Sequence, residues 1–248
     1  MKTSNKLLSI GAAFTLMAAV LSCEKRDSSE LAADEAVYQD YFVSYDMNTK
    51  KTSAAASLRD NNKTRLTLNR KGEKILFNKK LPKEAKSATG ALVDAFRASI
   101  TDYEYRWEVD KLIDGEFTYL KNKSKTFTNT IRLNEVEPIK IPASLGSVKL
   151  DGTTVLKWEG AAAGDKERID ISFEQNKTLY ARGTGKNTPK GQKEVTLKGD
   201  LIKGLKKGKA TLIVSRRKEL TGLRQSDGKK DNGRRIIEVV VKKEVAIE

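Results

Sequence analysis

The chain has 248 residues and a formal net charge of +15 at pH 7, from 48 Lys and Arg against 33 Asp and Glu. It contains no histidine and a single cysteine, Cys23. This composition excludes an intrachain disulfide, the common zinc sites, and the catalytic pairs of a serine or cysteine with a histidine.

The N-terminus has the layout of a secretory signal peptide. Lys2 and Lys6 precede residues 7–21, an apolar stretch without charge. This stretch is shorter than the roughly 20 apolar residues that a transmembrane helix needs. It ends in Val20-Leu21-Ser22-Cys23, which resembles a lipobox, where a small residue precedes a cysteine whose thiol receives a diacylglyceryl group. We therefore predict a lipoprotein signal peptide over residues 1–22, cleavage before Cys23, and attachment to a membrane through lipid on Cys23.

The residues after Cys23 are polar and charged, without strand periodicity, and predict a flexible tether over residues 23–36. Loss of residues 1–22 removes Lys2 and Lys6 and no acidic residue. The mature chain would therefore have 226 residues and a formal charge of +13. That length suits two domains of about 100 residues each.

Residues 37–140 alternate apolar and polar side chains with period two, which is typical of strands with one buried face. The turn at residues 46–50 predicts a first hairpin, and the turn at 70–73, between Leu68 and Ile75, predicts a second. Three further strands are expected around Trp107, Phe117 and Phe127. Within residues 91–100, apolar side chains four apart predict one short helix.

Several motifs in this half resemble the first domain of small envelope lipoproteins of Bacteroidota with an immunoglobulin-like fold. They are Ala56-x-Leu58-Arg59, Leu66-x-Leu68, Ile75-x-Phe77-Asn78, Gly115-x-Phe117-x-Tyr119 and Phe127-x-Asn129-Thr130-Ile131. The resemblance covers about 100 residues and involves turns and core positions. It implies an immunoglobulin-like β-sandwich and the cell envelope, and it implies no activity.

Prolines at 138 and 142, followed by small residues, predict a domain boundary near residue 140. Period-two alternation resumes after it, with strands expected around Val155, Ile171, Val195, Leu212 and Val239. The predicted fold class is therefore all-β, with two tandem immunoglobulin-like β-sandwiches over residues 37–140 and 141–248.

The second predicted sandwich is strongly basic. Between Lys186 and Arg235 there are sixteen Lys and Arg against five Asp and Glu. Such a field attracts anionic polymers, although a lysine-rich surface can also serve only to keep a protein soluble. The candidate anion-binding residues are Lys206, Lys207, Arg216, Arg217, Lys218, Arg234 and Arg235. Aromatic side chains that could stack on bases are scarce there, so we expect no specific nucleic-acid recognition.

These observations favour a non-catalytic binding or adhesion protein, anchored to the outer membrane and facing the periplasm or the cell surface. Its expected partners are the membrane and either an acidic polysaccharide or an envelope protein. The alternative is a structural accessory subunit of an outer-membrane or fibre assembly. A pair of carboxylates could support glycoside hydrolysis, but with 33 acidic residues, neighbours such as Glu135 and Glu137 are expected by chance. We expect no enzyme activity, no metal site and no cofactor other than the covalent lipid.

Overall fold

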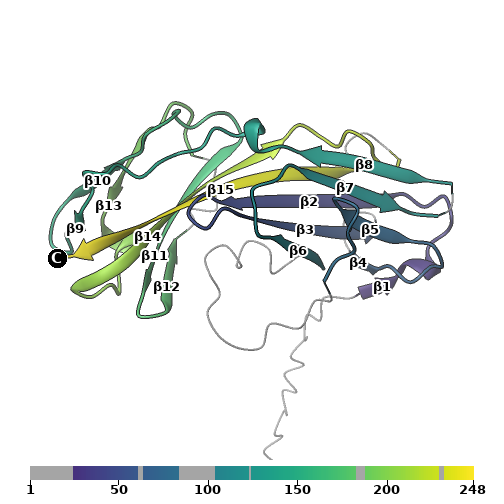
Figure 1. Cartoon of the computed structure of the whole chain (residues 1–248), viewed down its shortest axis with the longest axis horizontal. Helices are drawn as coiled ribbons and strands as arrows, with labels where there is room; N and C mark the ends of the chain where they lie inside the picture. Colours follow the sequence, from purple (N-terminus) through teal and green to yellow (C-terminus); the bar gives the residue numbers. More distant parts are fainter. Residues whose placement is uncertain (1–24, 61–63, 84–103, 123, 183–187, 229–231) are drawn as a thin grey trace, which may run out of the picture.

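The computed structural model describes residues 25–60, 64–83, 104–122, 124–182, 188–228 and 232–248. The fold is all-β with several sheets, which confirms the all-β part of the predicted fold class. The molecule is elongated, with two lobes arranged along its longest axis (Figure 1). Its described strands form one sheet of ten strands, one of three and one of two.

The first lobe has a layer from the ten-stranded sheet and a layer formed by the three-stranded sheet β5-β7-β8. The strands it contributes to the large sheet are β1 (Lys25–Asp27), β2 (Val37–Asp46), β3 (Lys51–Asp60), β4 (Thr64–Thr67) and β6 (Tyr105–Val109). The facing sheet consists of β5 (Lys74–Phe77), β7 (Gly115–Leu120) and β8 (Thr126–Ile131). Stacked rings fill the space between these layers, with Tyr41 and Phe117 at a centroid distance of 4.6 Å.

The second lobe continues the large sheet. Its strands there are β9 (Ser147–Val148), β11 (Glu167–Gln175), β12 (Thr178–Arg182), β14 (Gly208–Leu220) and β15 (Gly233–Ile247). The two-stranded sheet consists of β10 (Thr154–Lys157) and β13 (Glu194–Leu197). Trp158 and Phe173 lie in the core of this lobe, which is separate from the core of the first lobe.

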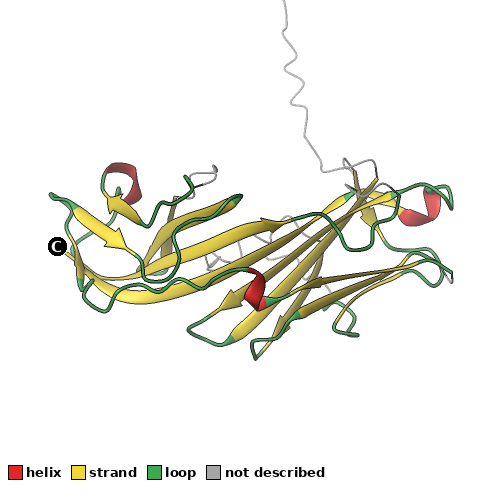
Figure 2. Ribbon diagram, turned by 90° about the horizontal axis from the view of Figure 1, so that it is seen from above, coloured by secondary structure: helices red, strands yellow, loops and turns green. Residues whose placement is uncertain are grey.

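The long strands β14 and β15 run through both lobes (Figures 1 and 2). Residues 233–240 of β15 pair in parallel with β2, while residues 241–247 lie in the second lobe. Leu220, Leu223, Ile237 and Val239 consequently belong to the core of the first lobe. The expected division at residue 140 therefore does not hold for Leu220, Leu223 and residues 233–240, because these parts of the chain return to complete the first lobe.

Local chemistry explains which predicted hairpins form. β2 and β3 make the predicted hairpin, because the Asp46 carboxylate accepts hydrogen bonds from the backbone amides of Asn48 and Thr49 and Lys50 adopts a positive φ of 57°. The second predicted hairpin is wrong. β4 pairs with β1 and β3 in the large sheet, whereas β5 pairs with β7 in the facing sheet. The turn at 70–73 thus connects two layers.

The predicted flexible tether is also wrong for residues 25–36. β1 pairs in parallel with β4, and the 3-10 helix η1 (Ser28–Glu30) follows it directly. Leu31 is buried in the core of the first lobe, and its carbonyl oxygen accepts a hydrogen bond from Arg70. Lys25 and Arg26 of this stretch form ion pairs with the first lobe, as in the Arg26–Asp60 pair at 3.0 Å.

The signal peptide, Cys23 and the helix expected over 91–100 lie outside the described residues. In the part of the chain that the structure describes, no helix has the length and apolar character needed to cross a membrane.

Candidate functional site

Arg216, expected to be exposed and to bind anions, lies inside the molecule. Side chains two positions apart on β14 share one face of the sheet, and Leu212 and Val214 on this face lie in the core of the second lobe. Arg216 is the next residue on the same face and is 1% exposed. Its Nε donates to a carboxylate oxygen of Glu167 at 2.9 Å. Its other nitrogens donate to the carbonyl oxygens of Glu137, Ala161 and Ala162. All three nitrogens of the Arg216 guanidinium therefore donate hydrogen bonds to groups inside the protein.

Lys218 and Arg235 also bind internal partners. Lys218 Nζ donates to the carbonyl oxygen of Glu135 at 3.2 Å and lies 3.7 Å from Glu167. Arg235 is buried and donates to the carbonyl oxygens of Thr130, Thr221 and Gly222. The 3-10 helix η2 (Leu133–Glu135) and the residues after it connect the two lobes. These cations therefore hold the connection against the sheet.

Arg217 and Arg234 lie on the opposite face of the large sheet. The guanidinium carbon of Arg217 is 5.2 Å from the centroid of the Phe42 ring. Arg234 donates to both carboxylate oxygens of Asp40, at 3.2 and 2.5 Å. Glu238 on the same face is buried, and burial raises its pKa although Arg217 and a hydrogen bond from Ser44 favour the charged form. These cations serve partly to balance buried carboxylates.

Of the seven candidate anion-binding residues, Lys206 and Lys207 are exposed and form no ion pair with the described residues. They belong to a group at the end of the second lobe that we call the lysine cluster, which consists of Lys177, Lys198, Lys203, Lys206 and Lys207. All five are exposed. The Gln175 side chain bonds to both the amide and the carbonyl of Lys206, which joins the 176–177 turn to the 203–209 segment. The turn that carries Lys177 therefore lies beside the segment that carries Lys203, Lys206 and Lys207, and Lys198 directly follows β13.

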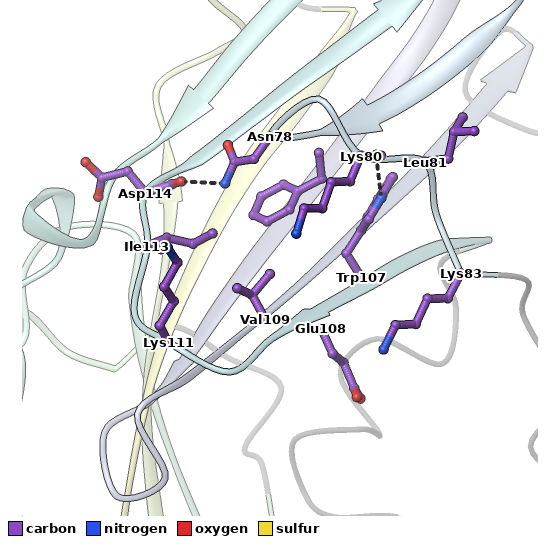
Figure 3. Close-up of a pocket in the computed structure, with 11 residues that line it drawn as sticks. Asn78, Lys80, Leu81, Lys83, Trp107, Glu108, Val109, Lys111, Ile113 and Asp114 are labelled. Carbon is purple, nitrogen blue, oxygen red and sulfur yellow. Dashed lines mark hydrogen bonds between the residues drawn. The ribbon is translucent and has the colours of Figure 1, made fainter.

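A pocket of about 470 Å³ opens in the first lobe, beside β6 and the turn that follows β5. Figure 3 shows Lys80, Trp107, Val109 and Ile113 pointing into the same space. The Phe77 and Trp107 rings, 5.8 Å apart, are both buried and form part of its lining. The pocket therefore has an apolar floor, and sequence alternation identified its aromatic residues only as core positions.

Hydrogen bonds fix the walls of this pocket. Phe77 and Lys80 exchange two backbone hydrogen bonds of 3.0 Å across a turn whose central residues, Asn78 and Lys79, have positive φ. The Trp107 indole donates to the Lys80 carbonyl at 3.0 Å, as Figure 3 shows. On the other side, Thr52 Oγ1 donates to the Lys111 carbonyl and accepts from the amide of Ile113. The pocket is preformed, which reduces the entropic cost of binding.

Charges around the mouth of the pocket have one predominant sign. Lys80, Lys83 and Lys111 are exposed, and no side-chain ion pair is found for them among the described residues. Glu108 and Asp114 also line the pocket, but their carboxylates point away from it in Figure 3. Asp114 instead accepts a hydrogen bond from the amide of Leu133. The amines therefore outnumber the carboxylates around the opening.

Among the described residues, no group of three metal-binding side chains converges. Asp227, in a turn that could be mistaken for a calcium loop, accepts hydrogen bonds from the amide of Val37 and from buried Lys121, the latter at 2.6 Å. Asp165 pairs with Lys190 and Asp170 with Arg168. These carboxylates have structural partners.

Comparison with protein-family models, with curated proteins and with solved structures gave no significant match. The lysine cluster and the pocket of the first lobe are the two candidate binding surfaces of the described chain.

Proposed function

We propose that this protein is a lipid-anchored lipoprotein of the cell envelope that acts by binding, without catalysis, and that the lysine cluster binds acidic polymers. The observation that carries the proposal is the group of five exposed lysines at one end of the second lobe. Two other exposed lysines of this lobe, Lys190 and Lys209, have acidic partners at 3.0 Å. The lysines of the cluster remain available to a polyanion.

The position of the cluster supports a role away from the membrane. Only Glu24 separates Cys23 from the start of β1. β1 lies at the opposite end of the molecule from the turns that carry the lysine cluster (Figure 1). Lipid on Cys23 would therefore hold the first lobe near the membrane, with the cluster directed outward toward acidic polysaccharide.

Replacing Cys23 with serine is expected to abolish lipidation, because a hydroxyl cannot replace the thiol that accepts the lipid. Two or three acyl chains hold a protein on a membrane, so without them the chain is expected either to stay uncleaved or to be released. The measurement is fatty-acid labelling together with the distribution between membrane and soluble fractions. A Cys23→Ser protein that still incorporates fatty acid would disprove the anchor.

Replacing Lys203, Lys206 and Lys207 together with alanine is expected to weaken heparin binding about tenfold near 0.1 M salt and to reduce the slope of log affinity against log salt by roughly 2 to 3. The slope falls because binding through fewer lysines releases fewer counterions from the polymer. The measurement is a salt titration of affinity with the soluble chain from Glu24.

The matched control replaces Lys71, Lys74 and Lys125, which are exposed lysines of the first lobe, with alanine. It removes the same charge at the other lobe and should alter the slope little. Equal effects of the two triple variants would show that binding follows net charge and that the lysine cluster is no site.

A second candidate function is a structural accessory subunit of an envelope or fibre assembly. The pocket in the first lobe favours it, because an apolar cavity that continues into an exposed leucine is the kind of apolar surface found at protein interaction sites. The two functions use different lobes and can be tested separately.

A further inference from the structure

The pocket of the first lobe continues into apolar surface outside its mouth. Leu81 lines the pocket and is 61% exposed, which is the larger exposure of the two exposed large hydrophobic side chains in the described chain. Phe77 and Trp107 below it are almost completely buried. Apolar surface thus extends from a deep floor to a leucine at the rim.

The size of the pocket suits a large side chain with part of its backbone. At about 470 Å³ it falls within the range of ligand pockets, roughly 300 to 1,000 Å³. A small solute confined to the cavity would cover Leu81 only in part. A chain crossing the mouth, with one side chain inserted, would cover more of Leu81, so the shape favours a peptide segment.

The charge at the mouth of the pocket indicates which residues of the bound segment would lie on either side of its inserted side chain. Lys80, Lys83 and Lys111 come from both sides of the opening, and the neighbouring carboxylates of Glu108 and Asp114 point away (Figure 3). Carboxylates on either side of an inserted side chain would reach these amines, whereas lysines or arginines would be repelled.

We propose that this pocket is a docking site for an acidic segment of a partner protein, with an aromatic or large aliphatic side chain inserted between Trp107 and Ile113. The inserted side chain gains affinity by leaving water, and the flanking carboxylates orient the segment and speed its association. The site lies in the first lobe and does not depend on polyanion binding by the lysine cluster.

Two tryptophans allow the site to be tested directly. The Trp107 indole donates to Lys80 at the pocket, while the Trp158 indole donates to Ala161 in the core of the second lobe. The probe is an unlabelled hexapeptide, Glu-Asp-Trp-Leu-Glu-Asp, added to the nitrogen-15-labelled soluble chain. We expect the indole N–H signal of Trp107 to shift in a saturable manner while that of Trp158 stays unchanged.

Two control peptides separate the contributions of charge and apolar contact. Glu-Asp-Ser-Gly-Glu-Asp keeps the charge without the apolar side chains, and Lys-Lys-Trp-Leu-Lys-Lys reverses the charge. Each should bind at least about tenfold more weakly. Equal binding of the Ser-Gly peptide would overturn the proposal, as would a Trp107 signal that the acidic peptide leaves in place.

Protein variants test the same contacts without disturbing the core. Leu81→Ser should weaken the hexapeptide roughly tenfold, whereas Val155→Ser, at the other exposed large hydrophobic residue, should have no effect. Lys80→Ala with Lys111→Ala should weaken binding at low salt, unlike Lys71→Ala with Lys125→Ala. If 3-phenylpropionate saturates the Trp107 shift as tightly as the hexapeptide, the pocket is a small-molecule site and the protein-docking proposal is wrong.

Discussion

Replacing Arg216 with alanine is expected to lower the free energy of unfolding by about 3 to 5 kcal/mol, which is the range for breaking a buried ion pair from one side. The substitution leaves the Glu167 carboxylate, 7% exposed, without the guanidinium 2.9 Å away. It also removes the donors to three carbonyl oxygens around the connection between the lobes. Urea unfolding followed by circular dichroism measures the change.

Two comparisons test this explanation. Lys207→Ala, at an exposed lysine, should change the free energy of unfolding by about 0.5 kcal/mol or less. The double substitution Arg216→Met with Glu167→Gln should be more stable than Arg216→Ala, because it also removes the buried negative charge at position 167 and the glutamine oxygen can still accept from the Gly164 amide. An Arg216→Ala protein as stable as Lys207→Ala would contradict the structural role of this arginine.

The alternation that predicted β14 contained the information that Arg216 is internal. Leu212 and Val214 are core residues, and the next position of the same period is Arg216. The sequence could not identify its partner, since Glu167 lies 49 residues earlier in the chain. Arg235 follows the same rule, because it is in phase with the buried Ile237 and Val239. Charge alone therefore misplaced two of the seven expected surface cations.

Strand alternation predicts which side chains are buried but not which strands pair. The pattern around Leu66, Leu68, Ile75 and Phe77 is that of a hairpin, yet β4 and β5 lie in different sheets. Phe77 could consequently be predicted as buried but not as the neighbour of Trp107. The pocket forms where the turn after β5, the edge strand β6 and the loop at residues 111–114 pack together. No local sequence pattern predicts contacts between segments so far apart in the chain.

The separate expression of residues 141–248 is expected to give a chain that aggregates or unfolds without a cooperative transition. In the intact protein, residues 233–240 of β15 pair with β2. Four large aliphatic side chains of this stretch are at most 3% exposed, namely Ile236, Ile237, Val239 and Val240. Their burial stabilises the protein by about 1.5 to 3 kcal/mol each, which together is comparable to the whole stability of a typical domain.

Removal of residues 1–140 would also leave β15 as a long, apolar edge strand, the kind of edge that pairs with other chains. Size-exclusion chromatography and urea unfolding of residues 141–248, compared with residues 25–248, measure both effects. Co-expression with residues 25–140 should restore solubility, since β2 can then pair with β15 and Tyr41 and Tyr45 can complete the core around Val239. A monomeric 141–248 fragment with a sharp unfolding transition would instead show that the second lobe folds independently and that its pairing with β2 adds little.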